Sequence, residues 1–349
     1  MKAPFVWFGG KRRVAPEVWA ALGDVPNYIE PFAGSLAVLL GRPHDMSNGT
    51  RRAETVNDAD GFLANFWRAL AHDPEAVAHW CDWPVNEVDL FARHLWLVNT
   101  GRSRLLEGME ADPDFYDAQV AGWWVWGVNA WIGSGWCSGD GPWVDTGDGI
   151  GKRPHLGDAG QGVNRQRPHL GSAGQGVNRQ LPHLGDAGRA GYNNMEYRPN
   201  VLGYFEELAG RLRDVRVCCG DWSRVCTRGA MSYGSRVGVF LDPPYLGDVR
   251  TADLYAVDDH TIAHAVRDWC LEHGDDPRLR IVLAGYRAEH DDLMPDTWRR
   301  HYYSASAAYS TTESAARQDG NHANRANEVL WFSPHCVTPD RQGELWEAL

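Results

Sequence analysis

The chain has 349 residues, 43% of them hydrophobic, which is enough for one large domain with a smaller one beside it. Its formal net charge of −12 argues against a protein that only binds nucleic acid, but it leaves room for an enzyme with a local basic cleft. No run of about 18 apolar residues occurs, so we expect no membrane span.

The cysteines and the N-terminus indicate a cytoplasmic protein. Seven cysteines are scattered along the chain without a C-x-x-C pair, which argues against a disulfide framework and a structural zinc site. The N-terminus, Met1 to Phe5, lacks the long apolar segment of a secretory signal. We therefore expect a cytoplasmic location in a bacterium, or in the host cell if a virus encodes the chain.

The first part of the chain alternates strand and helix. Residues 28–40 predict a short strand, a glycine-containing turn and the start of an apolar helix. Residues 54–70 predict a strand end and then a helix with apolar side chains at helical spacing. Asp73, Pro74 and Glu75 predict another helix start, because Asp caps a helix, Pro suits its first position and an acid favours its first turn.

A tryptophan-rich segment and a repeat then interrupt this alternation. Residues 121–136 carry five of the 17 tryptophans among glycines, and the glycine content argues against a helix interior. A 14-residue unit begins at Arg153, recurs at Arg167 and returns in a decayed copy at Leu181. Its glycine and proline content excludes a regular helix, and three short copies are too few for a solenoid, so we expect an extended loop.

Strands and helices alternate again after residue 200. The expected strands are Val215–Cys218, Val237–Leu241, Arg280–Ala284 and Glu328–Phe332, with a helix from Asp259 to about Glu272. This alternation predicts an α/β fold with a mostly parallel sheet and helices on both faces. The region from about 72 to 200 is then the candidate for an insertion.

The most specific chemical signal is Asp242-Pro243-Pro244-Tyr245, directly after the apolar run 237–241. Ligands of open α/β sheets bind at the carboxyl ends of the strands, where these residues are expected. Asp242 and a proline carbonyl can each accept one hydrogen of an exocyclic amine, and Tyr245 can stack on its base. The alternative is a rigid turn capped by an aspartate.

Two glycine-containing segments are weaker signals. Residues 30–35, EPFAGS, form a turn at which a cofactor can approach the backbone closely, although the dinucleotide pattern G-x-G-x-x-G is absent. A plain strand-to-helix turn is the alternative. Gly9, Gly10 and Lys11 resemble a phosphate loop only loosely, because the Walker spacing is missing, and a flexible terminal turn is the alternative.

In this order the motifs resemble the Dam-like family of DNA adenine-N6 methyltransferases. The matching pieces are PFxWxGGK, EPFAGS, Asn57-Asp58, Gly220-Asp221, DPPY and Asn327-Glu328-Val329-Leu330. The resemblance covers most of the chain outside roughly 75–200. It implies a Rossmann-like methyltransferase sheet built from residues 1–74 and 201–349, with 75–200 as an inserted target-recognition region that contains the repeats at 153–194.

The resemblance also implies roles for individual residues. The expected catalytic residues are Asp242, Pro243, Pro244 and Tyr245. The expected contacts of the cofactor S-adenosylmethionine are Trp7, Gly9, Gly10, Lys11, Glu30, Pro31, Phe32, Ala33, Gly34, Ser35, Asn57, Asp58, Asp221, Trp222 and Asp242. One departure is Leu36, which stands where many relatives have glycine and which narrows the backbone conformations allowed there.

The implied reaction is direct methyl transfer to adenine N6 in duplex DNA, after the base has left the stack, with no metal. The Trp123–Trp136 segment could stack on displaced bases or form a packing layer, and the arginines of the repeat could contact phosphates. His155, His169 and His183 are better explained as part of a duplicated unit than as metal ligands. We take a monomer as the working assumption and a restriction-modification role as the general context.

Three other functions remain open. DPPY also occurs in methyltransferases that act on cytosine N4, because the chemistry is that of any aromatic exocyclic amine. A non-catalytic nucleic-acid binding module on a methyltransferase scaffold is the second, although the intact Asp242 and Tyr245 argue against it. The third is RNA as the substrate.

Overall fold

The computed structural model describes residues 1–7, 10–43, 52–131, 136–137, 143–145, 150–152, 201–244, 259–303 and 328–338. The chain divides into two compact units. The helical unit comprises Met1–Trp7 and Ala59–Cys219, and the sheet unit comprises Phe8–Asp58 and Gly220–Leu349. The roles expected for residues 1–74, 75–200 and 201–349 remain predictions, and the compact units divide the chain at different positions.

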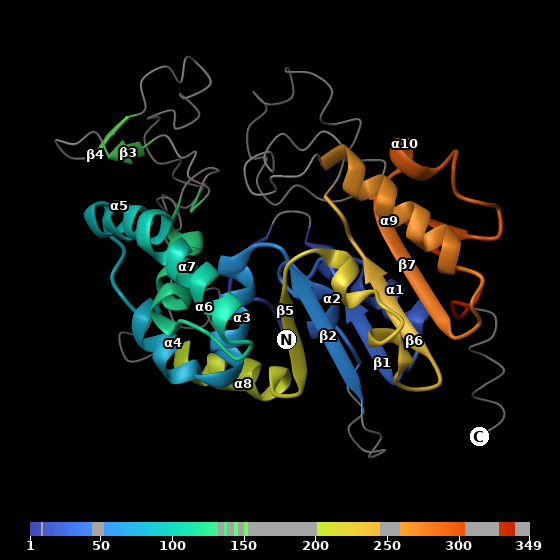
Figure 1. Ribbon diagram of the computed structural model, residues 1–349, viewed down its shortest axis with the longest axis horizontal. Coiled ribbons are helices and arrows are strands. Elements are labelled where there is room, and N and C mark those ends of the chain that lie inside the picture. The colour runs from blue at the N-terminus through green and yellow to red at the C-terminus, as the bar shows by residue number, and fades with distance from the viewer. Residues whose placement is uncertain are drawn as a thin grey trace, which may run out of the picture. The chain divides into compact units, whose positions relative to one another are not determined.

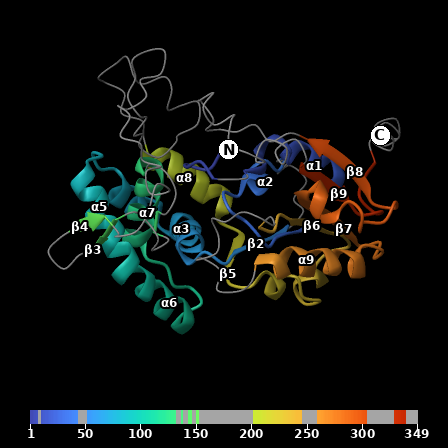
Figure 2. The same ribbon diagram turned by 90° about the horizontal axis from the view of Figure 1, so that it is seen from above.

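Six of the seven strands of a mixed sheet belong to the sheet unit, in the order β2-β1-β6-β7-β9-β8 (Figures 1 and 2). They are β1 (Asn27–Glu30), β2 (Ala53–Asp58), β6 (Val237–Leu241), β7 (Leu279–Tyr286), β8 (Arg299–Tyr303) and β9 (Glu328–Phe332). The pairs β1·β2, β1·β6 and β6·β7 are parallel. The α/β fold with a mostly parallel sheet is therefore confirmed, and the antiparallel pairs of β9 with β7 and β8 are an addition to it.

Helices cover both faces of this sheet. The helical segments of the unit are η1 (Lys11–Arg13), α1 (Ala15–Leu22), α2 (Ala37–Leu40), η4 (Trp222–Val225), η5 (Ala230–Ser232), α9 (Asp259–His273) and α10 (Arg287–His290). Figure 2 shows α1 and α2 on one face and α9 on the other. Helix α1 packs on β6 and β7 through a buried side that includes Val18 and Leu22, while α9 contacts β7.

The order of the strands brings two loops to one point of the sheet edge. Strands β1 and β6 are neighbours with Asn27 opposite Val237, and the sheet continues through β2 on one side and β7 on the other. Such a reversal of strand order leaves a crevice outside the carboxyl ends of the two strands, where ligands of open α/β sheets bind. The loops after Glu30 and Leu241 both start there.

The helical unit consists mainly of helices packed through large aromatic side chains. Its elements are α3 (Gly61–His72), α4 (Pro74–Cys81), α5 (Glu87–Trp96), the π-helical segment η2 (Leu97–Gly101), α6 (Arg102–Ala111), α7 (Ala118–Ala130), β3 (Trp143–Asp145), β4 (Ile150–Lys152), α8 (Val201–Leu212) and β5 (Val215–Cys219). Trp67, Phe66 and Phe205 are fully buried between these helices. As expected from the sequence, Asp73 caps α4, and its side chain accepts a hydrogen bond from the Ala76 amide.

Helix α7 contradicts the sequence-based expectation for residues 121–136. The glycines there argued against a helix interior, but Gly122 and Gly127 both lie inside α7. A Cβ atom at Gly122 would meet the Val77 carbonyl oxygen at 2.9 Å, and one at Gly127 would overlap the Trp136 ring. The prediction was wrong because tertiary packing, which needs the missing Cβ atoms, outweighs the low helix propensity of glycine.

Two tryptophans of this segment pack inside the helical unit, whereas Trp123, Trp131 and Trp136 are partly exposed. Trp124 and Trp126 are 2% and 1% exposed, and the Trp126 indole N–H donates to the Trp83 carbonyl oxygen. The repeats at 153–194, with their arginines and histidines, lie outside the described residues. In the part of the chain that is described, no helix is long and apolar enough to cross a bilayer.

Candidate active site

The DPP loop begins with an ion pair at the carboxyl end of β6. Every residue of β6 is buried, so the strand delivers Asp242 to the edge of the sheet as a fixed extension of the core. The Nζ atom of Lys11, in η1, lies 3.0 Å from Oδ1 of Asp242. Lys11 is only 5% exposed, and a buried ammonium group needs such a partner because its desolvation is unfavourable.

A second carboxylate approaches the same lysine. Glu328 is the first residue of β9 and is 5% exposed, and its cross-strand neighbours are Tyr286 and Tyr303. Burial raises the pKa of the Glu328 carboxyl, whereas the Lys11 charge and the Tyr303 side chain lower it and the Asp242 charge raises it. The two carboxylates and one ammonium therefore interact electrostatically at this edge of the sheet.

The turn after β1 has an unusual backbone. Gly34 has φ 47° and Leu36 has φ 55°, both in the left-handed region, and Leu36 is fully buried. The Gly34 amide donates to Oδ2 of Asp58 at 2.9 Å, and the Leu36 amide donates to the Ala33 carbonyl oxygen at 2.8 Å. Position 36 therefore has a left-handed backbone, which glycine adopts more easily than other residues, and leucine adopts it here.

Asn57 ties this turn to the loop that carries Asp221. Its side-chain amide donates to the carbonyl oxygens of Pro31 at 3.0 Å and Gly220 at 2.9 Å. Its backbone carbonyl oxygen accepts from the Ala33 amide at 2.8 Å. Because Asn57 is 2% exposed, these bonds form away from competing water, and they hold both loops in fixed positions.

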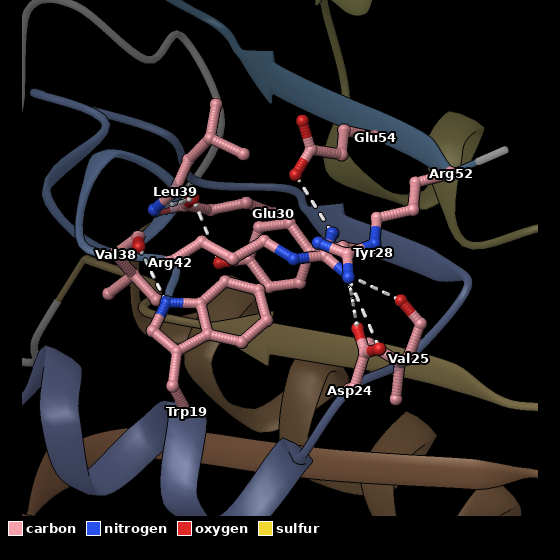
Figure 3. A network of polar contacts seen from close by, with 10 residues as sticks. All are labelled: Trp19, Asp24, Val25, Tyr28, Glu30, Val38, Leu39, Arg42, Arg52 and Glu54. Carbon is pink, nitrogen blue, oxygen red and sulfur yellow. Dashed lines mark hydrogen bonds and ion pairs between the residues drawn. The ribbon is translucent and has the colours of Figure 1, made fainter. Parts of the chain in front are cut away.

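Glu30, the last residue of β1, lies in a buried polar network (Figure 3). Its Oε2 atom accepts from the Tyr28 hydroxyl at 2.9 Å and from the Leu39 amide at 3.2 Å. Burial raises the pKa of Glu30 to about 8, with the charges of Asp242 and Glu54 adding to the rise and the two hydrogen bonds opposing it. The observed contacts of Glu30 are structural, and its contact with a cofactor remains a prediction.

Arg42 continues the same network on the side of α2 (Figure 3). Its guanidinium group pairs with Glu54 at 2.8 Å and lies over the Trp19 ring, 4.9 Å from the ring centroid. The Trp19 indole N–H donates to the Val38 carbonyl oxygen at 2.7 Å. These contacts fix the short helix α2, and therefore the far end of the turn, against the sheet.

Aromatic and acidic side chains at this edge suit a nucleoside. The rings of Phe32 and Trp222 stack with centroids 6.2 Å apart and an interplanar angle of 28°. Asp221 accepts from the Ser223 amide at 2.9 Å and so starts η4 next to Trp222. Flat apolar faces can stack on a purine, while the carboxylates of Asp58 and Asp221 can accept from amino or hydroxyl groups.

Comparison with known families agrees with this geometry. Residues 7–85 match the model of the family described as D12 class N6 adenine-specific DNA methyltransferase. The match covers less than half of the chain, and over these residues the sequence is similar to adenine-specific DNA methyltransferases. The family's reaction implies S-adenosylmethionine as the methyl donor. No curated protein sequence matches the chain.

The sheet unit contains most of the residues expected at the site. The residues placed there are Gly10, Lys11, Glu30, Pro31, Phe32, Ala33, Gly34, Ser35, Asn57, Asp58, Asp221, Trp222, Asp242, Pro243 and Pro244. Trp7 belongs instead to the helical unit, where it packs on Phe5 and Trp124. Gly9 and Tyr245 lie outside the described residues.

Two features of the candidate site were missed by reasoning from the sequence. Glu328 was noticed as part of a motif but given no role, and the network around Tyr28 and Arg42 was not foreseen. The sequence did contain a sign of this network, because Glu30 and Glu54 are charged residues within strands that are buried along their length. Among the residues that the structure describes, no group of three or more histidine, cysteine or carboxylate side chains could hold a metal ion.

Proposed function

We propose that the chain transfers the methyl group of S-adenosylmethionine to adenine N6 at specific sites in duplex DNA, by base flipping and direct transfer. The observation that carries this proposal is the ion pair between Lys11 and Asp242, 3.0 Å long, at the start of the DPP loop. It holds a carboxylate at the point of the sheet edge where a ligand is expected.

In the proposed reaction the carboxylate of Asp242 and the carbonyl oxygen of Pro243 accept hydrogen bonds from the N6 amino group. They turn the nitrogen lone pair toward the methyl carbon, and this alignment supplies much of the rate. The bound cofactor supplies an activated methyl group on a sulfonium. A nitrogen–carbon bond would form as the sulfur–carbon bond breaks to leave a neutral thioether, and the nitrogen would then lose one proton to solvent. Acceptors aimed at its hydrogens stabilise the positive charge that develops on the nitrogen.

The cofactor adenine is proposed to bind against Phe32 and Trp222, with Asp221 and Asp58 accepting hydrogen bonds from its amino or ribose hydroxyl groups. The two ring centroids are 6.2 Å apart, so one ring would have to shift by about 1 Å to give the roughly 7 Å that a purine between two aromatic faces needs. Asn57 holds the loops on either side of these residues.

Labelled methyl transfer to unmethylated duplex DNA, followed by nucleoside analysis, tests the reaction. We expect label in N6-methyladenine with the wild-type protein and at least a roughly 1,000-fold loss in Asp242→Ala, an estimate based on losing an oriented acceptor and its charge (~4 kcal/mol). Asp268→Ala is the matched control, because Asp268 is an exposed aspartate on α9 whose side chain is 67% exposed. It should keep full activity.

The nature of the labelled product decides between the alternatives. Label on cytosine would keep the chemistry and overturn the choice of base, and label only on RNA or single-stranded DNA would overturn the duplex substrate. Cofactor binding without transfer to any nucleic acid would contradict catalysis.

The cofactor site has its own test. Calorimetric titration with S-adenosylmethionine should show about 10-fold to 100-fold weaker binding in Phe32→Ala and Trp222→Ala, as expected for losing one stacking face (~1–3 kcal/mol). Trp83→Ala serves as the control, since Trp83 is a 42% exposed tryptophan of the helical unit. Unchanged binding in both site variants would overturn the proposed location of the adenine.

A further inference from the structure

Lys11, Asp242 and Glu328 interact at the edge of the sheet where β6 and β7 end and β9 begins. Strand β7 lies between β6 and β9, with Leu283 opposite Leu241 and Tyr286 opposite Glu328. The carboxyl end of β6 and the first residue of β9 are therefore at the same edge of the sheet. Asp242 continues from the first of these strands, and Glu328 begins the second.

Lys11 is the positive charge that both carboxylates share. It lies 3.0 Å from Asp242 and acts on the buried Glu328. A lysine ammonium has three donors and no acceptor, so it can serve two carboxylates at once. A buried carboxylate without a counter-charge is strongly unfavourable, so the positive charge of Lys11 favours the ionised form of Glu328.

We propose that Glu328 is a positioning residue for methyl transfer: its carboxylate helps to hold the Lys11 ammonium on Oδ1 of Asp242, which leaves the other oxygen of Asp242 for the target amine. This inference rests on the proposed function of Asp242. Without the charge at Glu328 the ammonium shifts along the Asp242 carboxylate and competes with the amine for its second oxygen. Loss of the Glu328 charge therefore disturbs how Asp242 meets the amine, and it leaves the binding of the cofactor unchanged.

The test uses Glu328→Gln, which keeps the shape of the side chain and removes its charge. We expect kcat to fall about 10-fold to 100-fold, with the KM for DNA and the Kd for S-adenosylmethionine changed less than about 2-fold, as for an interaction made mainly in the transition state. Glu289→Gln is the matched control. Its carboxylate is also buried, with 5% of the side chain exposed, and it accepts from the Tyr286 amide at 3.2 Å. The control should keep normal kcat.

A second measurement does not depend on catalysis. Thermal unfolding of the ligand-free protein is compared for the wild type, Glu328→Gln, Lys11→Met and the double variant. If the two charges are coupled, Glu328→Gln lowers the midpoint by several degrees in the wild-type background and by clearly less in the Lys11→Met background.

The two measurements separate the possible failures. Additive midpoint shifts would overturn the coupling of Glu328 with Lys11, whether or not the protein is active. Coupled shifts with an unchanged kcat in an active wild type would overturn the positioning role alone. A wild type that transfers no methyl group would overturn the proposed function and with it the role of Glu328 in transfer, even if the shifts are coupled.

Discussion

The Tyr28 hydroxyl donates a 2.9 Å hydrogen bond to Glu30, and both side chains lie inside the protein directly below the turn proposed to hold the cofactor. Burial raises the pKa of both groups, that of Glu30 to about 8. The carboxyl is therefore mainly neutral at pH 7. The floor of the proposed cofactor site is a hydrogen-bonded pair of neutral groups, which makes its stability sensitive to mildly alkaline pH.

Glu30→Gln is predicted to make the protein less sensitive to rising pH. The folded-state pKa of Glu30 lies above the unfolded value of 4.5, so its contribution to stability is complete below about 4.5 and is lost as the pH rises through about 8. A glutamine accepts the same two hydrogen bonds and never ionises. Relative to the wild type, the variant should gain on the order of a few kcal/mol between pH 5 and about 9.

Urea unfolding across this pH range measures the effect. Glu272→Gln, at an exposed glutamate near the end of α9, is the control and should follow the wild-type curve. If Glu30→Gln shows the same fall in stability as the wild type, the carboxyl of Glu30 is not the group responsible.

At Leu36, glycine is predicted to be tolerated better than alanine. Leu36 has φ 55°, and the left-handed conformation is unfavourable by roughly 1 kcal/mol for a residue with a Cβ atom. Both substitutions remove a fully buried side chain, with an expected loss of about 2–5 kcal/mol. Leu36→Gly relieves the backbone strain as well, so it should be more stable than Leu36→Ala by up to about 1 kcal/mol.

Urea unfolding of the two variants shows which of them is the more stable, and this ranking is the informative result. At a position with ordinary helical dihedrals alanine is more stable than glycine by a similar amount. Leu39, which lies in α2 and is also fully buried, provides the reference pair Leu39→Ala and Leu39→Gly. If alanine is the better residue at both positions, the left-handed backbone at Leu36 does not persist in solution.

Gly127→Ala in α7 is predicted to destabilise the helical unit by at least about 2 kcal/mol, because the new Cβ atom overlaps the Trp136 ring in a packed interior. Helix propensity alone predicts the opposite sign, since alanine is better than glycine in a helix by about 1 kcal/mol. Gly210→Ala in α8 is the matched control. A Cβ atom there meets nothing within 4 Å, so this variant should be slightly stabilised.

Thermal unfolding of the two alanine variants distinguishes packing from propensity. Midpoints that move in opposite directions are expected. A stabilised Gly127→Ala would mean that Trp136 does not pack on α7.

Most strands of the sheet unit, and its helices α2 and α9, could be predicted because their signals are local, whereas α1, α10 and β8 were not expected. The apolar run 237–241 is β6, and residues 328–332 are β9, at the boundaries expected from the sequence. The antiparallel direction of β9 could not be inferred, since it depends on how the chain returns to the sheet and not on the composition of the strand.

The parts of the site that escaped prediction are those made by tertiary contacts. Asp242 was identifiable because its motif is contiguous, whereas the interaction of Lys11 with Glu328 joins residues at opposite ends of the chain. Gly122 gave a misleading signal for the same reason. Its role depends on Trp80 and Val77 in another helix, which no local pattern records.

His94 is predicted to make the helical unit sensitive to acid. It is 2% exposed, stacks on Trp131 with ring centroids 4.8 Å apart, and accepts a hydrogen bond from the Cys137 amide at Nδ1. Burial lowers the pKa of His94 to about 4, whereas an unfolded histidine titrates near 6.5. Because the folded-state pKa is the lower one, the unfolded state binds the proton first, and stability falls as the pH drops from about 6.5 to about 4.

The measurement is the unfolding free energy of the wild type and of His94→Phe between pH 7 and pH 4, with near-ultraviolet circular dichroism to follow the tryptophans. Phenylalanine keeps an aromatic ring against Trp131 but leaves the Cys137 amide without its acceptor, so at pH 7 the variant should be less stable by about 1–2 kcal/mol. Its stability should then depend less on pH, and the gap should narrow toward pH 4. A gap that stays constant across this range would show that His94 does not titrate differently in the folded and unfolded states, and the acid sensitivity would have to come from another group.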